Sequence, residues 1–461
     1  MSTERYQIQW LRYPEAERYI DAAVSQFVVA LPPAGALKTA LHRRTSTRLI
    51  DWVDHLVLAD GDDVRAELHT MGFEPEAVPA EMGHAVFYHP GATLPRLLLR
   101  EGTEAPPGTT LAVAIGVERI NAFLAAHHVA APIEGTPLSP YRRATVWQGG
   151  GRALLAVERR GHRGFIPQEM EPDYPERYLA AYERWATRQR TFDDPFAGME
   201  RTLSQAEALV DDLGANTAAW IAFAAERAHW QRRNRAGQMQ RARQDQLGLG
   251  WANHDHHTFR SSRETFHLLI EILETLGFHR RERFYAGAEA GWGAQVLEQT
   301  ACGFAVFADV DLSPEEVSGD FAHQPLPPRE TLGTVGLWCA LHGDSMLAAG
   351  LHHLAVRLDF DAAAPDLAAW GVEMMEPFSD FSYLRQAFTR GERWEVPARR
   401  LAPLVTVNQI GADQRERFVE EGAVGSHLES IQRGEGFKGF NQQTVSDIIR
   451  RTDPRHESEA A

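Results

Sequence analysis

The chain has 461 residues and a formal net charge of −16, with 47 basic side chains against 63 acidic ones. This balance argues against nucleic-acid binding, which needs a basic surface, and no apolar run approaches the ~20 residues of a membrane span. The two cysteines, Cys302 and Cys339, are too few for a disulfide framework or a thiolate metal cage. We expect a cytoplasmic protein, and the length predicts two or three domains.

Two strand–helix–strand units are predicted in the first part of the chain. Residues 48–75 contain the strand WVDHLVLA and then a helix that Asp60 or Asp62 can cap and that Gly72 ends. The strand-like runs HAVFYH and PRLLLRE follow. The second unit begins with a strand and a helix over residues 110–132 and continues with the strands RATVWQ and ALLAVERR.

Residues 173–249 are mostly helical in pattern and precede two further units. In the third unit, which begins at residues 252–278, Ser261 and Glu264 have capping-box spacing before an apolar helix that Gly277 ends. The strands AQVLEQT and GFAVFADVDL follow. The fourth unit begins over residues 351–373 and has a short helix.

The four units resemble one another, and such internal repetition is informative about fold. The first and third share a DH pair and similar helix ends, HTMGFEP and ETLGFHR. We therefore predict an α+β fold of repeated βαβββ modules in two pairs, joined by a helical segment. The expected domains are an N-terminal domain over residues 1–172, a helical connector over 173–249 and a C-terminal domain over 250–461.

Histidine pairs open the third and fourth units, and each is followed by an arginine. His256 and Arg260 are four residues apart, as are His353 and Arg357, so each pair shares one face of its strand. The other histidine of each doublet has the opposite parity. If the two units form a pseudo-symmetric pair, His256 and His353 can meet on a concave surface.

Two imidazoles and one carboxylate on one face of a metal leave three positions open, as in non-haem Fe(II) oxygenases, although zinc also accepts such ligands. Spacing does not choose the carboxylate, and the ordinary alternative for each histidine is a structural or surface role. The candidates are Glu373, Glu395, Glu420, Glu421 and Glu429.

Three motifs resemble a known family. NHDHHTFRS, HLAVRLDFD and GSHLESIQRGEGF occur in order in the C-terminal part of the chain. They are similar to motifs of the 2-oxoadipate dioxygenase/decarboxylase family, whose fold is vicinal-oxygen-chelate-like. The second motif has Ala355 and Val356 where the family has Thr-Pro, and the third has Ile431 where an acidic residue is usual.

The resemblance implies a metal site and a reaction. It assigns His256, His353 and Glu429 as Fe(II) ligands and Arg260 as the catalytic, substrate-side arginine. The substrates would be a 2-oxo acid and O2, and 2-oxoadipate would give D-2-hydroxyglutarate in lysine breakdown. Arg260 suits a substrate carboxylate because a guanidinium binds one bidentately; Arg357 is a second substrate-binding candidate, although an ion pair with Asp359 is an equal alternative.

Two other functions remain open. The same fold and metal serve other reactions, such as those of an extradiol-type dioxygenase, an isomerase or a lyase. A metal-free protein that binds small molecules would not need the three candidate ligands to converge. The sequence does not indicate the oligomeric state.

The N-terminal half repeats only part of the pattern. Asp54 and His55 form a DH pair, but Ala59 stands at the arginine position. We favour a degenerate copy that packs against, or covers, the active half. The alternative is a second metal site with His55 and Glu158, which His84 or His89 would complete.

Overall fold

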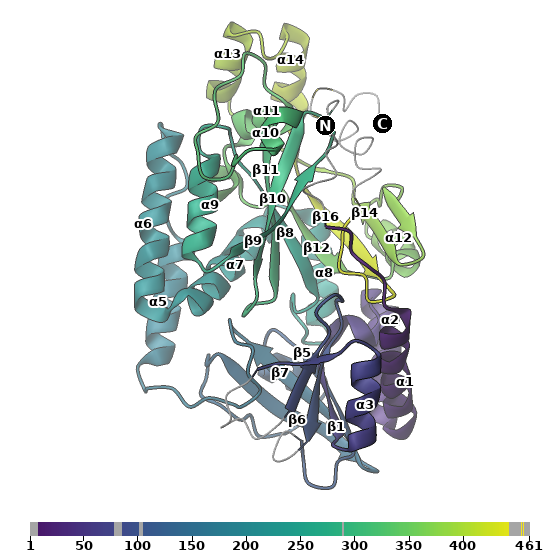
Figure 1. Cartoon of the computed structure of the whole chain (residues 1–461). Helices are drawn as coiled ribbons and strands as arrows, with labels where there is room; N and C mark the ends of the chain where they lie inside the picture. Colours follow the sequence, from purple (N-terminus) through teal and green to yellow (C-terminus); the bar gives the residue numbers. More distant parts are fainter. Residues whose placement is uncertain are drawn as a thin grey trace.

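A computed structural model describes residues 8–77, 85–100, 105–287, 290–441, 453 and 455. Two mixed β-sheets form the framework, and in Figure 1 the C-terminal sheet lies above the N-terminal one. Helices cover the outer sides of both sheets (Figure 1). Among the described residues no single helix is long and apolar enough to cross a membrane. One pair of helices, Pro14–Ala30 and Pro32–Thr45, has the length and composition of a membrane span only when taken together, and the two are bent by 115°.

The N-terminal sheet has seven strands in the order β2-β3-β4-β1-β5-β7-β6. Its central strands β1 and β5 are antiparallel, and each has a parallel neighbour, β4 or β7. The strands are β1 (Val53–Ala59), β2 (Glu74–Pro75), β3 (Ala85–Tyr88), β4 (Arg96–Arg100), β5 (Leu111–Gly116), β6 (Tyr141–Gly149) and β7 (Arg152–Arg159).

Four helices accompany this sheet: α1 (Pro14–Ala30), α2 (Pro32–Thr45), α3 (Asp62–Thr70) and α4 (Ile120–Ala126). The sequence analysis predicts neither α1 nor α2. Each of these helices has a proline in its first turn, where a backbone N–H would have no partner within the helix. Apolar side chains of both helices join the core of the sheet, including Phe27 and Leu41. The predicted cap of α3 is wrong, because Gly61 is its N-cap residue and Asp60 binds Arg65 instead.

The C-terminal sheet has nine strands, with β15 pairing β16 beside the main order β13-β14-β16-β12-β8-β11-β10-β9. Strands β12 and β8 form its antiparallel centre, with β16 and β11 as their parallel neighbours. The strands are β8 (His254–Arg260), β9 (His279–Tyr285), β10 (Trp292–Gln299), β11 (Phe304–Asp311), β12 (His353–Arg357), β13 (Ser379–Phe381), β14 (Leu384–Phe388), β15 (Glu392–Trp394) and β16 (Ala423–Arg433).

The remaining helices belong to the C-terminal half. Helices α5 to α9 contribute to one large core with the sheet, in which Phe223 of α7 stacks on Phe278 and Phe304. Their bounds, with those of the later helices, are α5 (Tyr174–Ala186), α6 (Pro195–Leu213), α7 (Ala215–Gln231), α8 (Arg235–Asp245), α9 (Phe266–Thr275), α10 (Pro314–Val317), α11 (Thr334–His342), α12 (Phe360–Ala368), α13 (Ala398–Thr406) and α14 (Ala412–Glu421).

The repeat predicted from the sequence is confirmed. The units β1-α3-β2-β3-β4, β8-α9-β9-β10-β11 and β12-α12-β13-β14-β16 follow the order βαβββ. In the second unit, β5-α4-β6-β7, the isolated bridge between Glu134 and Arg143 stands at the position of the second strand. The capping box predicted for α9 is not formed, because the Ser261 hydroxyl binds Thr265 and Asp344 and the helix begins at Phe266.

Helix α8 joins the two halves. Gln240 donates to the carbonyl of Thr45 at 2.9 Å, and Arg243 binds both Ser46 at the end of α2 and Asp366 in α12. These contacts of α8 with both halves fix one sheet relative to the other.

Candidate metal centre

Three neighbouring strands of the C-terminal sheet carry the predicted ligands. His256 lies on β8, His353 on β12 and Glu429 on β16. His353 is opposite Thr258 in the antiparallel pair β12–β8, and Ala355 is opposite Glu429 in the parallel pair β12–β16. Since side chains alternate along a strand, this register places all three on one face of the sheet.

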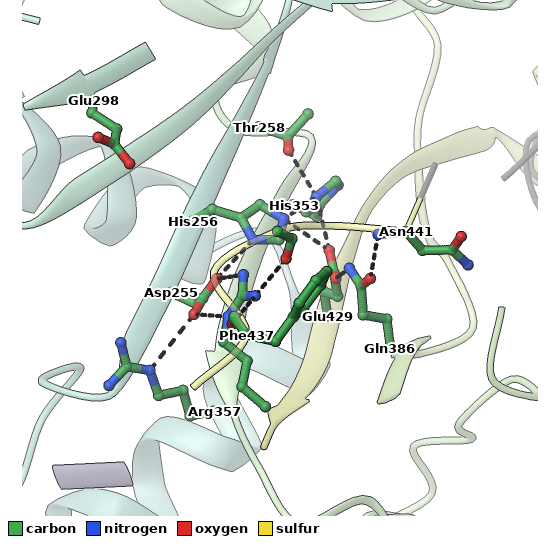
Figure 2. Close-up of polar contacts among 12 residues, drawn as sticks. Asp255, His256, Thr258, Glu298, His353, Arg357, Gln386, Glu429, Phe437 and Asn441 are labelled. Atoms are coloured by element: carbon green, nitrogen blue, oxygen red, sulfur yellow. Dashed lines mark hydrogen bonds and ion pairs between the residues drawn. The ribbon is translucent and has the colours of Figure 1, made fainter. Parts of the chain in front are cut away.

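The three side chains converge on one point (Figure 2). Oε2 of Glu429 lies 3.1 Å from Nε2 of His256 and 3.1 Å from Nε2 of His353, and the two Nε2 atoms are 3.4 Å apart. Ligands about 2.1 Å from a metal and at right angles are separated by about 3.0 Å. The separations therefore match three adjacent corners around one ion, and no other such group of three occurs among the described residues.

Each candidate ligand has a partner that orients it. Nδ1 of His256 lies 3.2 Å from Asp255, which Arg433 binds through two hydrogen bonds of 3.0 Å. Nδ1 of His353 lies 3.1 Å from Nδ1 of His352. Gln386 donates to Oε1 of Glu429 at 2.8 Å, which leaves Oε2 to face the imidazoles (Figure 2). Partners of this kind fix ring orientation and raise ligand basicity.

The electrostatics favour a positive charge within the cluster. Burial alone would lower the pKa of His256, but Glu429 and Asp255 raise it to about 9. Burial alone would raise the pKa of Glu429, but His256 and His353 hold it well below its usual value. An ionised carboxylate shared between two imidazoles stabilises either a proton or a metal cation, and the two compete for the same atoms.

The cluster opens into a small cavity of about 80 Å3 with an aromatic wall. Its aromatic side chains, apart from the histidines, are Phe284, Trp292, Phe307, Phe378, Phe388 and Phe440. The Thr258 hydroxyl also enters the cavity, 2.7 Å from Nε2 of His353. Such a wall limits the access of water and strengthens electrostatic interactions inside.

Arg260 also lines this cavity and is 3% exposed. Its Nε and Nη1 atoms have no hydrogen-bond partner among the described residues, and its nearest carboxylate, that of Asp309, lies 3.7 Å away. Burial raises the pKa of Asp309 to about 7, although Arg260 opposes this shift. The charge of Arg260 is therefore only partly balanced near neutral pH, as suits a group that binds an anion.

Arg357, the second candidate for substrate binding, does not line this cavity. Strands β8 and β12 are antiparallel, so the chain runs in opposite directions from His256 to Arg260 and from His353 to Arg357. Arg260 lies toward one end of the sheet, whereas Arg357 lies beside Asp255, with 3.6 Å between Nε and Oδ2. The two similar motifs thus place their arginines on opposite sides of the histidine pair.

Among the described residues, His55 and Glu158 do not come together as the alternative N-terminal site. Nδ1 of His55 lies 2.5 Å from Asp54. Glu158 instead binds Arg142 at 3.2 Å and Arg160 at 2.7 Å.

Of the two histidines proposed to complete that site, only His89 is among the described residues. His89 packs against Tyr13 and Phe73. His84 lies outside the described residues.

Sequence reasoning missed several residues around the cluster. Asp255 was visible as the first residue of a DH pair, and its contact with a ligand histidine could have been inferred from the usual carboxylate partner of such histidines. Gln386 and Phe440 gave no signal, since their positions depend on the pairing of β14 with β16 and on the path after β16.

No family model matches the chain, and no curated protein matches it. Several solved structures are similar at low TM-scores. A triple mutant of 4-hydroxymandelate synthase from Streptomyces coelicolor has 14% identity and a TM-score of 0.27, with 88% of this chain and 99% of that chain covered. Methylmalonyl-CoA epimerase from Mycobacterium tuberculosis has 13% identity and a TM-score of 0.23, with 40% and 89% covered. A putative hydrolase from Shewanella frigidimarina has 14% identity and a TM-score of 0.30, with 55% and 100% covered.

Proposed function

We propose that the chain is an Fe(II)-dependent dioxygenase that oxidatively decarboxylates a 2-oxo acid, with 2-oxoadipate as the first candidate. The observation that carries this proposal is a buried His256–His353–Glu429 cluster in the same aromatic cavity as an incompletely paired arginine. The motifs that resemble the 2-oxoadipate dioxygenase/decarboxylase family supply the choice of substrate.

The donor set fits iron. Two imidazoles and one carboxylate on one face of the ion would leave three adjacent positions for substrate and O2. When bound, Fe(II) supplies chelation of the 2-oxo acid and activation of O2. Zinc also fits these donors, so the identity of the metal rests on the reaction proposed.

Arg260 is proposed to hold the far carboxylate of the substrate. Arg260 is four positions after His256 on β8, which is about 13 Å along an extended strand, and the long side chain can shorten this span. A guanidinium forms two parallel hydrogen bonds with a carboxylate, so it fixes both the position and the direction of the substrate chain. The substrate would then be a diacid, with its 2-oxo end toward the cluster.

The remaining wall residues would protect and orient the reactants. The phenyl rings exclude water, which favours reaction with the bound acid over side reactions. Asp255 and Gln386 would hold His256 and Glu429 in place. Thr258 can hydrogen-bond to an oxygen of the substrate once His353 is engaged with the metal.

Two observations bear on the alternatives. Arg260 in the cavity favours a substrate with a second anionic group, which an isomerase, a lyase or an extradiol-type dioxygenase would not generally require. The convergence of the three candidate ligands disfavours a metal-free binding protein, for which their meeting would be a coincidence.

Oxygen uptake tests the proposal. Protein loaded anaerobically with Fe(II) is given 2-oxoadipate, and O2 consumption, CO2 and 2-hydroxyglutarate are measured together. One O2 should be consumed and one CO2 released for each 2-hydroxyglutarate formed. Glu429→Ala should lose the activity, whereas Glu373→Ala, which changes an exposed acid that the sequence also offered, should keep it.

Tight Fe(II) binding without uptake would reject 2-oxoadipate but keep the cluster as a metal site. Absence of Fe(II) binding would contradict the iron enzyme.

A further inference from the structure

A second cavity, of about 330 Å3, lies between the two halves of the molecule. Its wall combines residues of α1, β1, β5 and β7 with residues of α7, β8, β12 and β16. It shares no lining residue with the metal cavity. Three indoles contribute to its wall, those of Trp52, Trp220 and Trp251.

Most of the charged side chains in this wall have ion-pair partners. The pairs are Arg48–Asp51 at 2.7 Å, Arg159–Asp54 at 2.6 Å, Arg433–Asp255 at 3.0 Å and Glu118–Arg241 at 2.7 Å. Glu17 accepts a backbone hydrogen bond from Glu435. Two arginines of the wall, Arg227 and Arg357, are left without full compensation.

Arg227 is 5% exposed, and no carboxylate of the described residues forms an ion pair with it. Its hydrogen bond goes to Nε2 of His257 at 3.1 Å. The guanidinium otherwise faces the rings of Trp220 and Phe304 at 5.5 and 5.3 Å. A buried cation with no carboxylate at ion-pair distance is costly unless an anion joins it.

Arg357 is the second incompletely paired cation. Its Nε atom is buried without a hydrogen bond among the described residues, and its nearest carboxylate, Asp255, is 3.6 Å away. Asp255 already accepts two hydrogen bonds from Arg433 and one contact from His256. Arg357 therefore has donors available to a ligand in the cavity.

We propose that this cavity is a second binding site, for a small organic anion whose carboxylate or phosphate group is held by Arg227 and Arg357. Guanidinium groups bind the oxygens of either group bidentately, and the indoles provide an apolar surface for the rest of the ligand. The site is separate from the metal cavity and does not depend on the reaction proposed for it.

Calorimetric titration of the full-length, metal-loaded protein tests this site with three probes: inorganic phosphate, phenyl phosphate and glutarate. Phenyl phosphate should bind more tightly than inorganic phosphate, because its ring can contact the indoles. The comparison of inorganic phosphate with glutarate, neither of which carries a ring, distinguishes a phosphate ligand from a carboxylate one. Arg357→Gln should weaken binding by about tenfold or more, since a charge-assisted hydrogen bond is lost.

Two variants of the metal cavity make the result specific. Arg260→Gln and Glu429→Ala should retain the binding of phenyl phosphate, because neither residue lines the second cavity. Arg227→Gln should weaken binding like Arg357→Gln, and unfolding temperatures of all variants establish that they are folded. Arg357 is 31% exposed at its side chain, so Arg357→Gln decides the test if the Arg227 variant does not fold.

Saturable binding that is lost in Arg260→Gln or Glu429→Ala but kept in Arg357→Gln would place the anion in the metal cavity and overturn the proposal. Absence of saturable binding by all three probes at millimolar concentration would also overturn it. Either result leaves the oxygen-uptake test of the metal cavity unaffected.

Discussion

The N-terminal and C-terminal sheets have the same central topology, but only the C-terminal sheet carries a set of metal-ligand side chains. Registers across the central strands identify equivalent positions. In the C-terminal sheet His353 is opposite Thr258, which lies two residues after His256. In the N-terminal sheet Ala112 is opposite Val57, which lies two residues after His55. Alanine thus stands in the N-terminal sheet where a histidine stands in the C-terminal one.

The third ligand is missing in the same way. Glu429 is opposite Ala355, two residues after His353, and Leu155 is opposite Ala114, two residues after Ala112. Leu155 and both alanines belong to a buried apolar cluster with Phe165, whose ring lies 4.8 Å from that of His55. Packing therefore occupies the space that the ligands occupy in the other sheet.

The acid beside the histidine is common to both halves. Asp54 binds Arg159, with contacts of 2.6 and 2.9 Å, as Asp255 binds Arg433. Arg433 lies four residues after Glu429, the third candidate ligand, and Arg159 lies four residues after Leu155, which occupies the equivalent position. The Asp–His–Arg network is therefore part of the shared framework, and it does not by itself indicate a metal site.

The largest expected contrast between the halves is in metal binding. His256→Gln should lower Fe(II) affinity by more than about a hundredfold, because the loss of a ligand exceeds the loss of a residue that orients one. His55→Gln should leave both affinity and stoichiometry unchanged. Competition with a chromophoric chelator under anaerobic conditions measures both; equal loss in the two variants would contradict the assignment of the site to one sheet.

The next prediction concerns the stability in acid of the helices that pack on the C-terminal sheet. Glu226 is fully buried, and it binds Trp185, Arg188 and Arg190. Burial alone would raise its pKa, but the two arginines lower it to about 2. Because the folded-state pKa lies below the unfolded value of 4.5, this contribution of roughly 3 kcal/mol is present above pH 4.5 and is lost as pH falls toward 2.

Glu226→Gln tests this sign. The variant should be less stable than the unmodified chain at pH 7, and the difference should shrink between pH 4.5 and pH 2. Urea unfolding followed by circular dichroism across this range measures it. A difference that stays constant with pH would show that the carboxylate is not held ionised by the arginines.

The two acids of the Asp–His–Arg networks provide a matched pair of smaller effects. Asp255→Asn should lower metal affinity by about 10- to 100-fold, since the asparagine no longer fixes His256 through a charged acceptor. Asp54→Asn should leave metal affinity unchanged but lower the free energy of unfolding by about 2 kcal/mol, because Arg159 loses its carboxylate. Chelator competition and thermal unfolding of both variants separate the two roles.

The sequence was sufficient for the repeat and for the three residues that meet, but not for their surroundings. Strand parity selected His256 and His353, and motif resemblance selected Glu429 from five acids. The sequence pattern did not show that β8 and β12 run antiparallel, so it could not place Arg357. Helices α1 and α2 precede the first repeated unit, so the repeat did not predict them.

The opposite positions of the two arginines lead to the smallest contrast. Arg260→Gln should weaken binding of 2-oxoadipate to the anaerobic, Fe(II)-loaded protein by about tenfold or more, because its carboxylate loses a bidentate partner. Arg357→Gln should change this affinity by less than about twofold, as expected for a residue outside the metal cavity. Calorimetric titration of both variants checks the pair. A larger effect of Arg357→Gln than of Arg260→Gln would contradict this assignment. It would mean that the substrate extends from the metal cluster toward Arg357 and the N-terminal half.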